Sequence, residues 1–254
     1  MLQQPKAVVI GIGELGSVFA RGLLKTGVVV HPVTRAQPIR ETLAVAGPVD
    51  LILVAVGEEQ LFGVLADIPE DRRHRVALVQ NELVPRDWQT LGYTDVSGVV
   101  VWFEKKRGRD VHIVLPSLAY GPKAKFLNES LSSLDIPNEL LELDRLDHEL
   151  ALKNLYILVH NIAGMRFSET VSDLWRNHQG LMRALAEDIL CHQEARLEHT
   201  LDRVRLLDEL SKAVAADPGH GSAGRTAPMR LARVRRQAHE FGLVLDTLKL
   251  IDPE

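Results

Sequence analysis

A glycine-rich loop near the start of the chain carries its clearest chemical signal. An apolar run at 7–10 leads directly into Gly11-Ile12-Gly13-Glu14-Leu15-Gly16, the pattern G-x-G-x-x-G, and an amphipathic stretch follows as far as Gly27. Between a strand and a helix, glycines at this spacing allow a tight turn, close approach of the backbone to a pyrophosphate, and close packing of helix on strand. The first N–H groups of the helix would face the phosphates. The sequence therefore predicts that residues 11–16 bind a dinucleotide.

The residues after the second predicted strand (28–33) bear on which dinucleotide is bound. Sites for NAD often have an acidic residue here, which binds the ribose hydroxyls. This chain instead has Thr34 and Arg35, which suit a 2′-phosphate because a guanidinium forms charge-assisted hydrogen bonds with it. This favours NADP over NAD, the alternative being that Arg35 is simply a solvated loop arginine. Val56, at the end of the third predicted strand, completes the expected cofactor site.

The elements around this loop indicate two different halves. Strands are predicted at 28–33, 50–56, 76–79, 97–103 and 111–115, with a helix at 60–66. Helices are predicted at 146–165, 179–207 and 231–241, without further strands. Strands that alternate with helices are typical of an α/β sheet. We expect a Rossmann-type domain at 1–140 and an all-helical domain at 141–254, with the substrate bound between them.

Composition excludes several classes of protein. The chain has 254 residues, a net charge of −4 and one cysteine, Cys191. It therefore has no disulfide framework and no overall attraction to nucleic acid or anionic lipid. No apolar run is long enough to span a bilayer, and the first strand begins too early to leave room for a signal peptide. We expect a cytoplasmic protein that binds neither membranes nor nucleic acid.

Four segments resemble the ketopantoate reductase family, and the resemblance extends over nearly the whole chain. They are GIGELGS at 11–17, LILVAV at 51–56, VALVQN at 76–81 and ALKNLYILVHN at 151–161. The resemblance implies a helical domain of the kind that ends 6-phosphogluconate dehydrogenase. It also implies that Lys153 is the general acid that protonates the substrate carbonyl, that Asn161 contacts the substrate, and that Asn81 lies close to cofactor and substrate. A proton donor of this kind is what hydride delivery to a carbonyl group requires.

The chain also departs from the family pattern. An asparagine of the family is replaced by Ile157, the glycine after Asn81 by Glu82, and a lysine after the third strand by Gly57. The family's C-terminal glutamate would fall at Ala227 or Thr226, and Ser222 is the nearest match to a serine that binds the substrate carboxylate. These changes imply a substrate other than ketopantoate. Since His160 is seven residues after Lys153, we hypothesise that it supplies a lost hydrogen bond or proton.

Together these observations favour an NADPH-dependent oxidoreductase that reduces a small 2-oxo acid or related carbonyl compound. One alternative is a dinucleotide-binding sensor or complex subunit with little reductase activity. Another is an opine- or imine-forming reductase, which acts on a C=N bond. The long apolar helices would suit a homodimer. No metal is expected, because the acids and histidines near Cys191 have no matching ligands on another predicted helix.

Overall fold

The computed structural model describes residues 4–79 and 82–251 and divides the chain into two compact units, Met1–Leu146 and Asp147–Glu254. The boundary expected after residue 140 falls a few residues before this division. Among the described residues, no helix combines the length and the apolar character needed to cross a membrane.

The first unit is built on a seven-stranded sheet with the order β2-β1-β3-β4-β5-β8-β9. Its strands are β1 (Lys6–Ile10), β2 (Val29–Val33), β3 (Leu51–Val54), β4 (Val76–Leu78), β5 (Ser97–Val100), β8 (Ser117–Tyr120) and β9 (Asn138–Leu140). The first five are parallel, β8 runs antiparallel to β5, and β9 is parallel to β8. Strands β3 and β4 are buried throughout, which explains their continuous aliphatic sequences. The predicted α/β class is confirmed.

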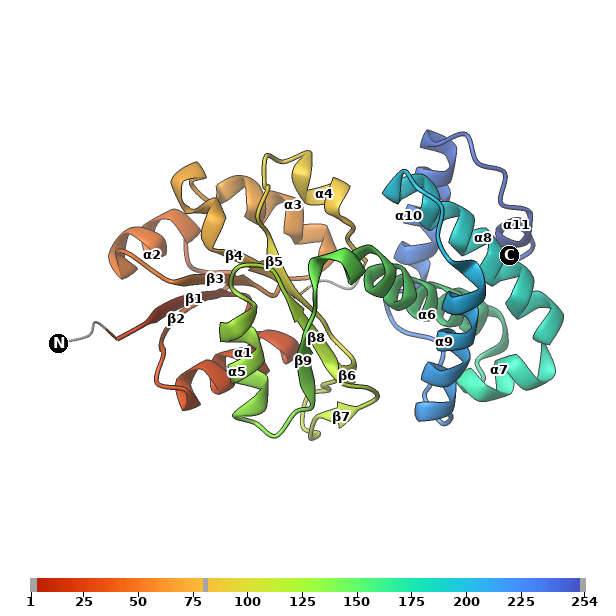
Figure 1. Ribbon diagram of the computed structural model, residues 1–254, viewed down its shortest axis with the longest axis horizontal. Coiled ribbons are helices and arrows are strands. Elements are labelled where there is room, and N and C mark those ends of the chain that lie inside the picture. Colours follow the sequence, from red (N-terminus) through yellow and green to blue (C-terminus); the bar gives the residue numbers. More distant parts are fainter. Residues whose placement is uncertain (1–3, 80–81, 252–254) are drawn as a thin grey trace. The chain divides into compact units, whose positions relative to one another are not determined.

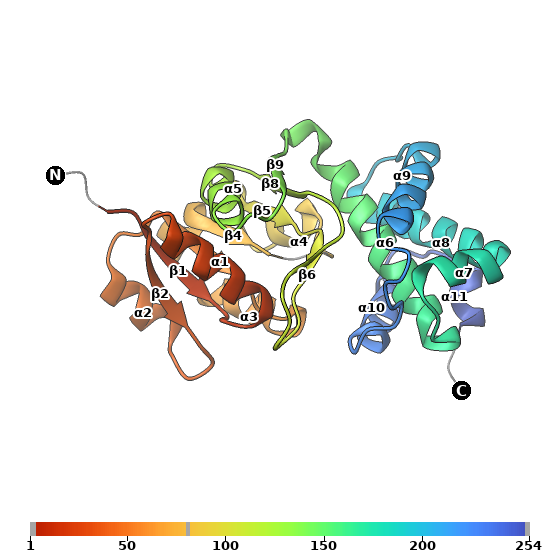
Figure 2. The same cartoon turned by 90° about the horizontal axis from the view of Figure 1, so that it is seen from below.

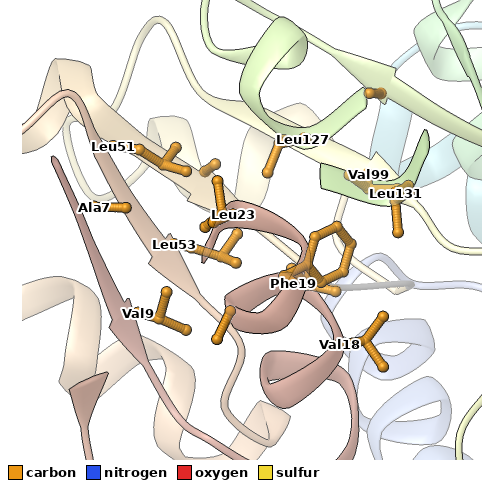
Figure 3. Close-up of a cluster of buried hydrophobic side chains, with 14 of the residues drawn as sticks. Ala7, Val9, Val18, Phe19, Leu23, Leu51, Leu53, Val99, Leu127 and Leu131 are labelled. Atoms are coloured by element: carbon orange, nitrogen blue, oxygen red, sulfur yellow. The ribbon is translucent and has the colours of Figure 1, made fainter. Parts of the chain in front are cut away.

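Helices cover both faces of this sheet, as Figure 1 shows. One face carries α1 (Glu14–Lys25) and α5 (Ala124–Ser132), and the other carries α2 (Ile39–Ala46), α3 (Glu58–Asp67) and α4 (Pro85–Gln89). Short 3-10 helices lie at Glu70–Arg75 and Leu143–Arg145. Figure 3 shows the core between α1, α5 and the sheet, where Phe19 and Leu23 pack against strand residues such as Leu53. This packing fixes the start of α1 relative to the end of β1.

Two further features complete the first unit. Strands β6 (Phe103–Glu104) and β7 (His112–Ile113) form a separate antiparallel hairpin. Strand β2 ends the sheet in the described part of the chain, and it contains Pro32. A proline has no N–H to donate, so within a sheet it is found mainly in edge strands.

The second unit consists of helices, which Figure 2 shows from a second direction. They are α6 (Leu146–Phe167), α7 (Val171–Asn177), α8 (Gln179–Leu197), α9 (Arg203–Ala216), α10 (Ala227–Glu240) and α11 (Asp246–Leu250). Helix α6 is buried on every side from Glu149 to His160. A helix buried all round lies in the interior of its domain, so the polar residues that α6 carries need partners within the protein.

One predicted helix is wrong. The segment 179–207 is not continuous, because α8 ends where Glu198 adopts a left-handed conformation with φ of 63°. The next helix begins after Asp202, whose side chain accepts a hydrogen bond from the N–H of Arg205. An aspartate in this position is a common N-cap. This signal was present in the sequence, but apolar periodicity across the break concealed it.

The contact between α1 and α5 depends on Gly22. A Cβ atom at this position would lie 2.2 Å from the carbonyl oxygen of Ser130, so we expect Gly22→Ala to destabilise the first unit by about 1–3 kcal/mol through overpacking. The control is Gly63→Ala in α3, where nothing lies within 4 Å of the added atom. It should stabilise by about 0.5–1 kcal/mol because alanine favours the helix. Urea unfolding measures both, and equal effects would contradict this account.

Candidate functional site

A pocket of about 560 Å³ lies in the first unit, and the loops after β1 and β3 both line it. The chain leaves β1 for β2 on one side and later enters β3 on the other side, so the two loops diverge at the carboxyl end of the sheet. Ligands of α/β proteins bind at this point. Six of the predicted cofactor residues line the pocket: Gly11, Ile12, Gly13, Thr34, Arg35 and Val56.

The three glycines of the loop have different reasons to be glycine. Gly11 has φ of 91°, and a Cβ there would lie 2.6 Å from the carbonyl oxygen of Ala55. A Cβ on Gly16 would lie 1.8 Å from the carbonyl oxygen of Gly11. Gly13 has an ordinary φ of −82°, and a Cβ added to it would meet nothing within 4 Å. The fold therefore accounts for Gly11 and Gly16, whereas no described contact accounts for a glycine at position 13.

Two other predicted residues of the loop, Leu15 and Glu14, contact other parts of the first unit. Leu15 packs against the core cluster of the first unit. A side-chain oxygen of Glu14 accepts a hydrogen bond of 3.1 Å from the backbone N–H of Arg107 in the β6–β7 hairpin. Neither residue lines the pocket. The carboxylate of Glu14, at the first position of α1, thus helps to hold the hairpin beside this helix.

Thr34 and Arg35 lie in a turn after β2 that Gln37 stabilises. The side-chain oxygen of Gln37 accepts hydrogen bonds from the backbone N–H of Thr34 at 2.9 Å and from its hydroxyl group at 3.1 Å. Arg35 is exposed and lines the pocket. Sequence reasoning missed Gln37, although a polar residue three positions after a strand end is a common turn signal. Asn81, the predicted substrate contact after β4, lies outside the described residues.

In the second unit, Lys153 is a buried base on the central helix. Its exposed fraction is 8%, and its ammonium nitrogen lies 5.7 Å from the centre of the Tyr156 ring. Burial, together with the positive charge of Arg230, lowers the pKa of Lys153 to about 7. A lysine with a pKa in this range exchanges its proton at physiological pH, which is typical of a general acid or base.

Asn161 lies on the same helix and connects two other segments. Its side-chain oxygen accepts a hydrogen bond of 2.5 Å from Arg230 of α10, and its amide nitrogen donates to the carbonyl oxygen of Ser222 at 3.1 Å. No pattern in the sequence links Arg230 to Lys153 and Asn161, because Arg230 is one of several arginines in a charged helical segment. In the structure Arg230 is bonded to Asn161, and its positive charge acts on Lys153.

The hypothesis that His160 supplies a lost hydrogen bond or proton is wrong, because both of its ring nitrogens have partners in the second unit. Its Nε2 atom accepts a hydrogen bond of 2.9 Å from the indole N–H of Trp175, and its Nδ1 atom lies 2.6 Å from the carbonyl oxygen of Tyr156. Nδ1 therefore carries the single proton of a neutral ring. Burial lowers the pKa of His160 to about 4, so the ring stays neutral at physiological pH. It holds α6 and α7 together.

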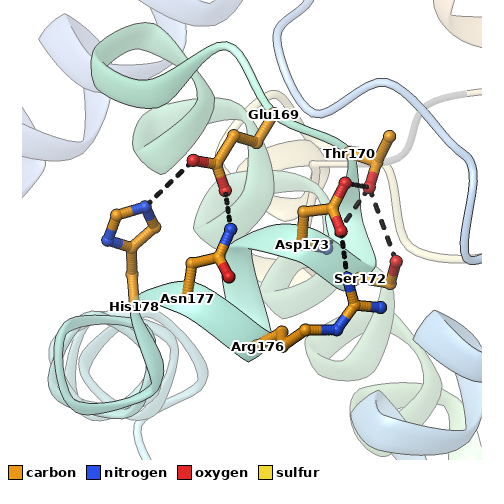
Figure 4. A network of polar contacts seen from close by, with 7 residues as sticks. All are labelled: Glu169, Thr170, Ser172, Asp173, Arg176, Asn177 and His178. Carbon is orange, nitrogen blue, oxygen red and sulfur yellow. Dashed lines mark hydrogen bonds and ion pairs between the residues drawn. The ribbon is translucent and has the colours of Figure 1, made fainter.

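A polar network around the turn between α6 and α7 supports the segment that contains Ser222 (Figure 4). The Glu169 carboxylate contacts Asn177 at 3.1 Å and His178 at 3.2 Å. Thr170 caps α7 by accepting a hydrogen bond from the N–H of Asp173. The backbone carbonyl oxygen of Glu169 accepts hydrogen bonds from the backbone and hydroxyl groups of Ser222. Ser222 is thus held by the fold, and its own carbonyl oxygen is presented to Asn161.

The acids near Cys191 have a structural role. Arg203 at the start of α9 bonds Glu187 at 2.7 Å and Glu194 at 2.5 Å, and it lies 3.3 Å from the sulfur atom of Cys191. These contacts hold α9 against α8 after the break at Glu198. Among the described residues, no group of three or more histidine, cysteine or acidic side chains is arranged to hold a metal ion.

Comparisons with known proteins identify the fold. No protein-family model matches the sequence, and no protein of curated function matches it. Among solved structures, 2-dehydropantoate 2-reductase from Geobacter metallireducens has a TM-score of 0.69 at 13% identity, covering 97% of each chain. A dimeric ketopantoate reductase from Staphylococcus aureus has a TM-score of 0.65 at 17% identity, covering 97% of this chain and 95% of that chain.

A structure of D-mandelate dehydrogenase with NADH is also similar. Its TM-score is 0.66 at 14% identity, and the match covers 97% of this chain and 96% of that chain. The chain thus has the fold of the ketopantoate reductases over nearly its whole length, from the seven-stranded sheet to the helical unit. The fold expected from the sequence resemblance is confirmed.

Proposed function

We propose that this protein is an NADPH-dependent oxidoreductase that reduces a small 2-oxo acid or a related carbonyl compound. The observation that carries the proposal is Gly13, which lines a pocket where the loops after β1 and β3 diverge. No described protein atom lies within 4 Å of the place where a Cβ on Gly13 would be, so packing does not explain the glycine. A backbone without a Cβ at this point admits a pyrophosphate. The similar fold of D-mandelate dehydrogenase, solved with NADH, supports a nicotinamide dinucleotide.

The residues of the pocket fit such a cofactor. The N–H groups at the start of α1, directly after Gly13, are suited to phosphate oxygens because the helix dipole favours negative charge there. Thr34 and Arg35 would bind the ribose and its 2′-phosphate. The pocket volume of about 560 Å³ lies within the usual range for ligand sites. When bound, the cofactor supplies the hydride.

Lys153 is the proposed general acid. Reduction of a carbonyl group takes a hydride at carbon and a proton at oxygen, giving an alcohol. The Lys153 ammonium would donate that proton and then recover one from water. Asn161 is also proposed as a substrate-positioning residue, acting through the segments that its amide holds, which are Arg230 of α10 and the Ser222 carbonyl group. Asn81 is proposed to contact the substrate. The dimeric Staphylococcus aureus reductase supports the proposal that this chain also forms a homodimer.

A second candidate is a dinucleotide-binding sensor or subunit without reductase activity. The family's glutamate is expected at Ala227 or Thr226. Ala227 favours this second candidate, because it is a small residue that is 1% exposed and belongs to the core. The two candidates share the cofactor pocket. They differ in whether Lys153 performs chemistry, so turnover that depends on Lys153 separates them.

The first test concerns Gly13. Because alanine tolerates its backbone conformation and meets no protein atom, we expect Gly13→Ala to leave the unfolding midpoint unchanged. The added methyl group should weaken NADPH binding at least about tenfold by keeping the pyrophosphate from the backbone. Fluorescence titration measures this, and Gly63→Ala is the matched control. Unchanged NADPH affinity in folded Gly13→Ala would remove the main support for the cofactor site.

The choice between NADPH and NADH is tested at Arg35. We expect Arg35→Gln to weaken NADPH binding about tenfold or more, since one charge-assisted contact with the 2′-phosphate is lost. Affinity for NADH should change little. Arg40→Gln is the control, because Arg40 is exposed nearby on α2 and does not line the pocket. An equal loss of affinity for NADPH and NADH would show that Arg35 does not bind the 2′-phosphate.

The role of Lys153 predicts a dependence on pH. A general acid must be protonated, and the pKa of Lys153 is lowered to about 7. The rate of carbonyl reduction should therefore fall as pH rises through about 7, and Lys153→Ala should abolish turnover while NADPH still binds. Stopped-flow oxidation of NADPH across a panel of 2-oxo acids measures both. Full turnover by Lys153→Ala would contradict the assignment.

Stability provides an independent check on the same pKa. The unfolded chain keeps the lysine proton up to its ordinary pKa of 10.5, whereas the folded state loses it near 7. Between these values the unfolded state binds more protons, so stability rises with pH across this window. Lys153→Met should therefore increase the melting temperature more at pH 6 than at pH 9. A gain independent of pH would show that the pKa of Lys153 is not lowered.

A further inference from the structure

The turn after β2, residues 34–37, is closed by hydrogen bonds between its first and last residues. The backbone N–H of Gln37 donates to the carbonyl oxygen of Thr34 at 3.0 Å. In the opposite direction, the side-chain oxygen of Gln37 accepts from the backbone N–H of Thr34 at 2.9 Å and from its hydroxyl group at 3.1 Å. Arg35 and Ala36 lie between them. The contacts between Thr34 and Gln37 therefore determine the position of the Arg35 backbone.

The same contacts determine which way the side-chain amide of Gln37 is turned. A backbone N–H can only donate, so the Gln37 atom that faces Thr34 must be the oxygen. The reversed amide would place its NH2 group against the N–H of Thr34 and leave that N–H without its acceptor. Both hydrogen bonds that the described residues make to the Gln37 side chain end on its oxygen. Because Gln37 is exposed and lines the pocket of the proposed cofactor site, its NH2 group is available to a ligand.

The hydroxyl group of Thr34 has the opposite hydrogen-bonding preference. Its proton is donated to Gln37, so toward a ligand its oxygen can only accept. A ribose hydroxyl group has a proton to donate, whereas an ionised phosphate has only acceptor oxygens. Thr34, which also lines the pocket, is thus suited to a ribose hydroxyl group and unsuited to a phosphate.

Arg35 alone leaves part of a 2′-phosphate without a partner. Among the described residues that line the pocket, Arg35 carries the one positive charge and Asp67 the one negative charge. A guanidinium group can bond two phosphate oxygens side by side, and a phosphate monoester has three oxygens that accept strongly. A further donor is therefore needed for the third oxygen. Gln37 is two residues after Arg35 in the same turn, and its NH2 group is such a donor.

We propose that Gln37 is a specificity-determining residue, whose NH2 group binds the 2′-phosphate of NADPH next to Arg35. A hydrogen bond to an ionised phosphate oxygen is stronger than one to the neutral 2′-hydroxyl group of NADH, so this contact favours NADPH. In the same arrangement, the Thr34 oxygen accepts from a hydroxyl group of the ribose. The proposal rests on the proposed function and extends it, because it adds to Arg35 a neutral donor whose orientation the turn determines.

The experiment compares two nucleotides that differ only in the 2′-phosphate, adenosine 2′,5′-bisphosphate and adenosine 5′-monophosphate. Protein whose glutamine side-chain amides carry an NMR-active nitrogen isotope reports on the NH2 group directly, and the signal of Gln37 is assigned by its absence in Gln37→Met. We expect the bisphosphate to shift this signal and the monophosphate to shift it much less. A residue that only stabilises the turn would respond equally to both nucleotides.

A substitution measures how much the contact contributes to affinity. Gln37→Glu keeps an oxygen for Thr34 but replaces the NH2 group by a second oxygen, so it retains the turn and loses the donor. We expect it to weaken binding of the bisphosphate at least about tenfold, since it also repels the phosphate, and binding of the monophosphate by less than about threefold. Gln89→Glu is the matched control, because Gln89 is exposed on α4 and does not line the pocket. Isothermal titration calorimetry measures the affinities, and melting temperatures check that each variant folds.

Two results would overturn the inference and leave the proposed function in place, in protein that binds NADPH. One is an equal shift of the Gln37 signal with both nucleotides, and the other is an unchanged ratio of the two affinities in Gln37→Glu. If the unaltered protein binds neither NADPH nor NADH, the proposed function fails at the cofactor site, and the role of Gln37 fails with it.

Discussion

Close contact between α1 and the end of β1 is the constraint on which the first unit depends. It is made without side chains, since a Cβ on Gly16 would lie 1.8 Å from the carbonyl oxygen of Gly11. Phe19 and Leu23 then pack between the sheet and α5. As a result, the N-terminus of α1 opens into the pocket where β1 and β3 diverge. Packing of the core thus determines where the backbone N–H groups are available to a ligand.

In the second unit, the constraint is that α6 is buried on all sides and nevertheless carries polar side chains. Most of these groups are bonded to the protein, as His160 is to Trp175 and Asn161 to Arg230. At Lys153, burial and the positive charge of Arg230 both lower the pKa of the ammonium group. An arrangement that disfavours the charged state of the free protein is common at functional sites, where a ligand supplies the compensation.

Local patterns in the sequence predicted those features that depend on neighbouring residues. The glycine loop, the buried strand around Leu53 and the helix that contains Lys153 each have a signature within about 15 positions. Arg230 could not be assigned in this way, because its meaning depends on Asn161, which lies 69 positions earlier in the chain. The role of His160 also depended on a donor from the next helix, Trp175, because the packing of α7 against α6 determines this contact. The break at Glu198 was missed because residues on both sides of it share apolar spacing.

Pro32 affects whether the edge strand β2 can pair with a strand of another molecule. The N–H of Val29 and the carbonyl oxygen of Val33 both point toward the neighbouring chain segment on the β1 side, so the nitrogen of Pro32 points to the opposite, outer edge. A strand added there would lack a donor at this position, which disfavours edge-to-edge pairing and aggregation. The outer edge of β2, which leads to the turn with Thr34 and Arg35, is therefore a poor template for pairing with a strand of another molecule.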